Sequence, residues 1–157
     1  MRLLLWAVAL SVAPDLDAAG FWLGVPYDSP FGHRGLTHSI FFSFFLAAAV
    51  TAAVFRDSPS PIGVFVLLFL CGASHGFFDA MTDGGRGVAL LAPFDWQRYF
   101  LPWRPIRVSP IGIGRFLGPR GLAILESELL AMWIPCAAFG ALGVLVRGSR
   151  RRPHGNA

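Results

Sequence analysis

The stretch that decides the fold is FGHRGLTHSIFFSFFLAAAVTAAVF, residues 31–55, in which two histidines and an arginine precede a long apolar run. From Ile40 to Phe55 only Ser43 and Thr51 are polar. A hydrocarbon core about 30 Å thick needs about 20 apolar residues of helix to cross it. Leu36–Phe55 meets that requirement, so we predict a membrane-spanning helix with a polar block at its mouth.

The composition favours an integral membrane protein. Of 157 residues, 55% are hydrophobic and only 14% are charged, whereas a soluble domain has about 25% charged residues. The length suits a single membrane-embedded domain over 1–157. The formal charge of +4 comes mostly from an Arg-rich tail at 147–157. Such a tail is typical of a cytoplasmic membrane surface, and no nucleic-acid partner is expected.

Two further segments are long and apolar enough to span. Pro61–Met81 begins with a proline in the first helical turn, where its missing N–H costs nothing. Leu122–Val146 contains Pro135, which a membrane helix tolerates as a kink. The expected fold is therefore all-α, a polytopic membrane bundle of about four helices.

The first apolar segment, Leu3–Ala13, has two interpretations. Its eleven residues make a helix of about 16 Å, too short to cross alone. One interpretation is a short or tilted helix that ends at Pro14. The other is a secretory signal peptide with a small-residue cleavage site at Ser11-Val12-Ala13.

A long irregular loop is expected between the last two helices, over Thr82–Gly121. It contains LLAPFDWQRYFLPWRPIRVSPIGIGRF (residues 90–116), which is too apolar for a flexible linker and too interrupted for a span. Its Trp and Arg residues suit the headgroup region. Interfacial anchoring and substrate binding both remain open. Arginines near the helix ends favour both termini in the cytoplasm.

Ionisable residues recur at the ends of the predicted helices. Such groups are costly at membrane depth and tend to face a bundle interior or a wet cavity. In an up-down-up-down bundle these ends emerge on one membrane face, which predicts a single polar cluster there. Its candidates are Asp15, Asp17, His33, His38, His75, Asp79, Glu126 and Glu128.

Spacing constrains these candidates. His75 and Asp79 are four residues apart and share a helical face, as two metal ligands or as a buried hydrogen-bonded pair. Glu126 and Glu128 are two apart, so at most one of them faces the site. Arg34 suits a forked hydrogen bond to a phosphate oxygen or a place among lipid headgroups.

The side-chain types favour a transition metal. Imidazoles and carboxylates without thiolates suit zinc, manganese or iron better than calcium. Cys71 and Cys136 lie in apolar runs and are interpreted as core residues. With more than four candidates, a two-metal site and a one-metal site with an aspartate or Glu128 as general base both remain open.

The order PDLD (14–17), GHRGLTHS (32–39), HGFFDAMTDGG (75–85) and LLAPF (90–94) resembles the YdjM-like family over roughly residues 14 to 135. Its members are inner-membrane proteins regarded as metal-dependent hydrolases, distantly similar to zinc-dependent phospholipase C. The resemblance implies a helical fold and a phosphoester substrate. It singles out Asp15, Asp17, His33, His38, His75 and Asp79 as metal ligands. With these ligands we expect Asp17, Glu128 and Arg34 to carry the chemistry.

One departure from the family pattern matters. Members commonly begin with a short extra segment that carries a histidine, and here no histidine precedes His33. A missing ligand would weaken one metal position.

Three functions follow from this pattern. The favoured one is a membrane-bound hydrolase of a lipid-like or envelope phosphoester that uses a divalent metal, foremost zinc. The alternatives are a non-catalytic membrane protein with a buried polar cluster, and a transporter that handles metal ions or protons.

Overall fold

The computed structural model describes residues 1–110 and 116–150, with side chains described as far as Arg147. The chain divides into two compact units, Met1–Arg104 and Pro105–Ala157, and each is described by itself. The prediction of an all-α fold is confirmed, since the described residues form helices and isolated β-bridge positions but no strand. Three helical stretches, Arg2–Leu23, Pro61–Ala80 and Pro119–Arg147, are long and apolar enough to cross a membrane.

The first helix continues past the proline that was expected to end it. α1 (Arg2–Val12) leads directly into a 3₁₀ helix, η1 (Ala13–Leu23). Pro14 has no N–H to donate, so α-helical bonding stops there while the tighter 3₁₀ turns carry on. Asp15 and Asp17 therefore lie within a 22-residue helical segment and not at the end of a helix.

The second helix is shorter than predicted. Leu36–His38 form a 3₁₀ turn, η2, and α2 covers Ile40–Val54. The Ser39 side chain accepts a hydrogen bond from the N–H of Phe42, at 3.0 Å, and so caps α2. At 1.5 Å per residue, the 15 residues of α2 extend about 22 Å, so the expectation that Leu36–Phe55 crosses the membrane as one α-helix was wrong.

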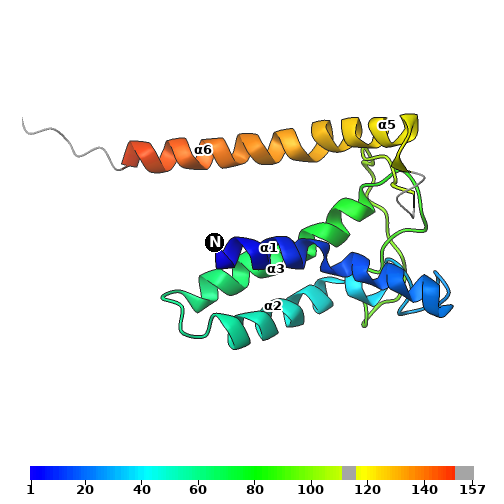
Figure 1. The fold of residues 1–157 in the computed structure, drawn as a ribbon, viewed down its shortest axis with the longest axis horizontal. Helices are drawn as coiled ribbons and strands as arrows, with labels where there is room; N and C mark the ends of the chain where they lie inside the picture. Colours follow the sequence, from blue (N-terminus) through cyan, green and yellow to red (C-terminus); the bar gives the residue numbers. More distant parts are fainter. Residues whose placement is uncertain (111–115, 151–157) are drawn as a thin grey trace, which may run out of the picture. The chain divides into compact units, whose positions relative to one another are not determined.

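The third helix, α3 (Pro61–Ala80), agrees with its prediction to within one residue. It packs against both α1 and α2 (Figure 1). The core between these helices is built from Leu10, Ala47, Val50, Val64 and Leu68. Burial of a large aliphatic side chain of this kind stabilises a folded protein by about 1.5–3 kcal/mol in water. The core also brings the end of α3 that carries His75 and Asp79 beside η1 and η2.

The loop that follows α3 is irregular, as predicted, over its described residues. Val88 and Tyr99 form an isolated antiparallel bridge, and the Ala92–Pro93 peptide bond is cis. The loop is also tied to the other elements of its unit through its backbone. The N–H of Ala89 donates to the carbonyl of Arg34, and the N–H of Leu101 donates to the carbonyl of Ala80.

In the second unit, α5 (Pro119–Glu128), a π-helical turn (Leu129–Trp133) and α6 (Ile134–Arg150) follow one another directly. They include the predicted span Leu122–Val146. The π-helical turn immediately precedes Pro135, where the missing N–H interrupts the α-helical ladder. Residues 151–157 of the predicted Arg-rich tail lie outside the described residues.

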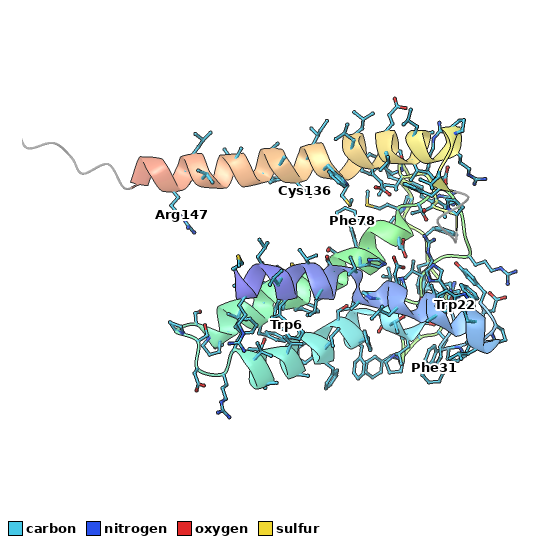
Figure 2. The ribbon with its side chains drawn as sticks, in the orientation of Figure 1. Trp6, Trp22, Phe31, Phe78, Cys136 and Arg147 are labelled. Carbon is cyan, nitrogen blue, oxygen red and sulfur yellow. The ribbon has the colours of Figure 1, made fainter. Side chains whose placement is uncertain are left out.

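Two large aromatic side chains are exposed at the end of η1 and in the loop that follows it. Trp22 is 90% exposed and Phe31 is 69% exposed (Figure 2). Tryptophan is enriched where a membrane meets water. Trp22 therefore supports placing this end of the unit at such an interface.

Gly76 on α3 is the point where the helix approaches the polar turn most closely. A Cβ added there would lie 2.2 Å from the carbonyl oxygen of His38. We expect Gly76→Ala to lower the free energy of unfolding by about 1–3 kcal/mol through overpacking, which thermal unfolding in detergent will measure.

Gly140→Ala is the control, because its added Cβ would meet no atom within 4 Å. Alanine is favoured over glycine within a helix by about 0.5–1 kcal/mol, so this variant should keep or slightly raise the unfolding temperature. Equal unfolding temperatures for the two variants would contradict the close approach at Gly76.

Candidate metal centre

Asp17 is the centre of the buried hydrogen-bond network. Its side chain is 2% exposed, and His33 Nδ1 lies 2.7 Å from Oδ1. The hydroxyl of Thr37 donates to Oδ2 at 2.6 Å, and the backbone N–H of Arg34 reaches the same oxygen at 3.3 Å. His38 Nδ1 lies 3.1 Å from Oδ2 as well. Both oxygens of Asp17 therefore already have partners within the protein.

His38 is fully buried, and its two ring nitrogens have different surroundings. With Nδ1 beside Asp17, the Nε2 atom is directed towards Asp15 and Asp79. Burial disfavours the imidazolium, but the surrounding carboxylates of Asp15, Asp17 and Asp79 outweigh it and raise the pKa of His38. A cation that binds here would displace a proton from His38.

His75 is oriented in the same way by a backbone group. Its Nδ1 lies 2.8 Å from the carbonyl oxygen of Ser11. Because a carbonyl only accepts, Nδ1 carries a proton, and in the neutral tautomer this leaves the lone pair on Nε2. A histidine ligand usually donates its other N–H to such an oxygen, which fixes the tautomer and the ring orientation.

Four side-chain atoms converge with the spacing of a tetrahedral site. His38 Nε2 lies 3.5 Å from Asp15 Oδ1 and 3.3 Å from Asp79 Oδ2. His75 Nε2 lies 3.3 Å and 3.8 Å from the same two oxygens. Ligand atoms about 2.0–2.1 Å from zinc in a tetrahedron are separated by about 3.3–3.4 Å. The spacing fits a single ion of that size.

The same atoms lack other partners. Within the described part of the chain, His38 Nε2, His75 Nε2 and Asp79 Oδ2 are buried and make no hydrogen bond. Buried polar atoms without partners cost free energy and are uncommon. An ion held by Asp15, His38, His75 and Asp79 would satisfy all three at once. Asp15 is 56% exposed at its side chain and forms the open side of the group.

A second arrangement of possible ligands shares two of these residues. Ligand atoms of Asp15, Asp17, His33 and His38 also lie within 4.8 Å of one another. In that group, however, Asp17 is already engaged by four donors, and His33 Nδ1 is paired with it. The geometry therefore favours the first group.

Arg34 holds Asp79 in place from the opposite side. Its Nη2 donates to Asp79 Oδ1 at 2.9 Å, which leaves Oδ2 for the converging group. Its Nη1 donates to the hydroxyl of Thr82 and the carbonyl of Gly84. Arg34 has a φ of 63°, a left-handed conformation that is uncommon outside glycine and is found at functional sites. Its Nε is buried and makes no hydrogen bond within the described residues.

The loop that precedes η2 depends on glycine and on a distant arginine. A Cβ added at Gly35 would lie 2.4 Å from the carbonyl oxygen of Pro30, so only glycine fits this turn. Arg98 donates to the carbonyl oxygens of His33 and Tyr27, each at 2.9 Å. These contacts explain why GHRG precedes the helix.

The structure brings together most of the predicted site residues from three separate elements. They are Asp15, Asp17, His33, Arg34, His38, His75 and Asp79. Glu126 and Glu128 belong to the second unit, and the role of Glu128 stays a prediction.

Three orienting groups were missed. They are the hydroxyls of Thr37 and Thr82 and the carbonyl of Ser11. Both threonines fall inside the motifs GHRGLTHS and HGFFDAMT, which was an available signal. The carbonyl of Ser11 could not be predicted, because every residue has a backbone carbonyl and the sequence does not distinguish one from another.

Comparisons with known proteins agree with this architecture. The profile of a family described as YdjM inner membrane protein matches residues 1–151. The inner membrane protein YbcI of Escherichia coli (strain K12) is 37% identical over 137 residues, which cover 85% of this chain and 78% of YbcI. No solved structure matches the chain.

The network around Asp17 allows a test of stability. We expect Asp17→Ala to lower the free energy of unfolding by several kcal/mol, because each buried donor left without an acceptor costs about 1–3 kcal/mol. Asp28→Ala is the control, since Asp28 pairs with Arg86 where both side chains are more than half exposed and such a pair contributes about 0–1 kcal/mol. Thermal unfolding in detergent measures both, and equal stability of the two variants would contradict the central place of Asp17.

Proposed function

We propose that this chain, which belongs to the YdjM inner membrane protein family, is a metal-dependent hydrolase that cleaves a lipid-like or envelope phosphoester at the membrane surface. The observation that carries the proposal is the convergence of His38 Nε2, His75 Nε2 and Asp79 Oδ2, all buried and without hydrogen bonds within the described residues. Together with Asp15 Oδ1 they form contacts of 3.3–3.8 Å between imidazole and carboxylate, which supports a cation shared among them.

The proposed ligands of a divalent ion are Asp15, His38, His75 and Asp79. Two imidazoles and two carboxylates at tetrahedral spacing suit zinc, and manganese and iron accept the same atom types. We propose that His33 and Asp17, also predicted as ligands, instead support the first group, because His33 pairs with Asp17 and Asp17 lies beside the ligand His38. We therefore propose one ion per chain.

The chemistry divides between the ion and the chain. A divalent ion supplies Lewis-acid polarisation of a phosphoryl oxygen and lowers the pKa of water enough for hydrolysis near neutral pH. Asp17 and the Ser11 carbonyl orient the two imidazoles, and Arg34 orients Asp79. Because Asp17 already makes four contacts, we assign it to this orienting role, and the role of Glu128 as general base stays a prediction from the sequence. The free Nε–H of Arg34 suits the predicted contact with a phosphate oxygen.

Metal content tests the ligand assignment. Elemental analysis of the detergent-purified protein should find about one zinc, manganese or iron ion per chain. His38→Ala and His75→Ala should lose it, because removing one ligand of four opens the site. His33→Ala should retain it with lowered affinity, by about 10–100-fold for an outer-shell partner.

Asp79→Asn should also lose the ion, because it removes one of the two carboxylate ligands, and Asp57→Asn is its matched control. Asp57 is exposed and pairs only with its neighbour Arg56 among the described contacts, so its substitution should leave the metal content unchanged. Unchanged metal in both His38→Ala and His75→Ala would overturn the assignment. If the unsubstituted protein contains two ions per chain and His33→Ala loses one of them, the one-ion assignment is wrong and the site holds two metals.

Hydrolysis tests the proposed activity. The metal-loaded protein should hydrolyse the soluble phosphodiester bis(p-nitrophenyl) phosphate, and chelation of the ion should stop the release of p-nitrophenol. His75→Ala should lose this activity together with its metal, whereas Asp57→Asn should keep both. If the protein binds the ion but hydrolyses neither this ester nor phospholipids, the proposed hydrolase activity is wrong, whereas the proposed metal ligands are still supported.

A further inference from the structure

An apolar groove of about 430 Å³ lies beside the metal centre. α2 contributes Ile40, Phe41 and Phe44, and the loop after α3 contributes Leu90, Leu91, Ala92, Phe94 and Asp95. The rings of Phe41 and Phe94 form one wall, with their centroids 5.3 Å apart. Apart from Asp95, every lining residue is apolar. Neither the ligand set nor its supports uses this groove.

The groove and the metal centre share the chain segment that starts α2. The N–H of Ile40, two residues after the ligand His38, donates to the carbonyl of Leu90 at 3.0 Å. A Cβ added at Gly76 would meet both the His38 carbonyl and Leu90 Cδ2. Gly76 directly follows the ligand His75. The innermost part of the groove therefore adjoins the elements that hold the two imidazoles.

The dimensions favour a hydrocarbon chain over a protein helix. A volume of about 430 Å³ would hold only roughly one turn of a helix 10 Å across. It falls within the about 300–1,000 Å³ of small-ligand sites. Phe94 is 82% exposed and Leu91 is 49% exposed. In an inner membrane protein, such side chains meet acyl chains.

Asp95 gives the groove one polar edge. Its carboxylate accepts a hydrogen bond from the N–H of Gln97 at 2.8 Å and another from the hydroxyl of Tyr99. Both oxygens of this carboxylate therefore have partners within the loop, and the rest of the groove offers only apolar surface. Such a surface suits the hydrocarbon part of a membrane phospholipid and not its anionic phosphate.

We infer that the groove holds one hydrocarbon chain of the phospholipid substrate, whose phosphate lies at the metal centre. The inference rests on the proposed function and extends it. It makes the substrate a lipid that remains in the bilayer, selected by its chain as well as by its phosphoester.

Photolabelling of the full chain tests the groove without relying on activity. The protein is placed in nanodiscs of phosphatidylethanolamine and phosphatidylglycerol, with part of the phosphatidylglycerol carrying a diazirine on one acyl chain. After irradiation, peptide mass spectrometry should find several-fold more label on residues 40–44 and 90–95 than around Leu67 and Leu70, which are also exposed and apolar. Equal labelling of the two surfaces would overturn the inference.

A matched pair of variants sharpens this test. Leu91→Trp places a larger ring in the groove, and Leu67→Trp makes the same change on α3, where the exposed fraction is similar at 42% against 49%. Labelling of residues 40–44 should fall several-fold in Leu91→Trp and stay unchanged in Leu67→Trp. Unchanged labelling in Leu91→Trp would overturn the inference. Metal content reports whether each variant is folded, and if Leu91→Trp is not, the comparison of the two surfaces in the unsubstituted protein decides.

Kinetics separate this inference from the proposed function. Leu91→Trp should raise KM several-fold for long-chain phosphatidylglycerol in mixed micelles, whereas Leu67→Trp should leave this KM and the hydrolysis of bis(p-nitrophenyl) phosphate unchanged. If Leu91→Trp and the unsubstituted protein have the same KM for the long-chain lipid, the inference about the groove is wrong, but the proposed hydrolase activity is unaffected. If the unsubstituted protein hydrolyses neither compound, the proposed function fails, and the labelling pattern still decides whether the groove holds a lipid chain.

Discussion

The placement of Asp17 constrains the rest of this structure. Its buried carboxylate gathers the side chains of His33, Thr37 and His38 and a backbone N–H of the turn before α2. Because buried charges are tolerated only where they are paired and hydrogen-bonded, η1 and the η2 turn must meet at this point. The apolar core of α1, α2 and α3 then brings His75 and Asp79 against the same turn.

The network has two layers with different roles. The inner layer is the convergent set of two imidazoles and two carboxylates, and the outer layer is the set of groups that orient them. Asp17, the Ser11 carbonyl and Arg34 each satisfy one side of an inner group and leave its other side free. Such an outer layer is what distinguishes a site prepared for an ion from a cluster that satisfies itself.

Particular residues show how far the sequence could lead. Pro61 marked the start of α3 because proline is favoured in a first helical turn, and the four-residue spacing of His75 and Asp79 placed them on one face. The same reasoning ended the first helix at Pro14 and began the second at Leu36. In the structure the first helix continues past Pro14 as a 3₁₀ helix. The second begins only at Ile40, because Ser39 is its N-cap. Alternative start and end points of a helix differ by small free energies, so tertiary contacts decide between them.

The sequence by itself determined that the protein is a helical membrane protein of the YdjM family, and which imidazoles and carboxylates were candidates for a polar cluster. These properties follow from the length of the apolar runs and from the order of the motifs along the chain. Only the tertiary structure decided which nitrogens of His38 and His75 face the carboxylates of Asp15 and Asp79, and that Asp17 makes four contacts. It also decided that a groove adjoins the site. The reason is that each of these depends on atoms from segments far apart in the chain, whose distances arise only when η1, η2, α3 and the following loop are packed together.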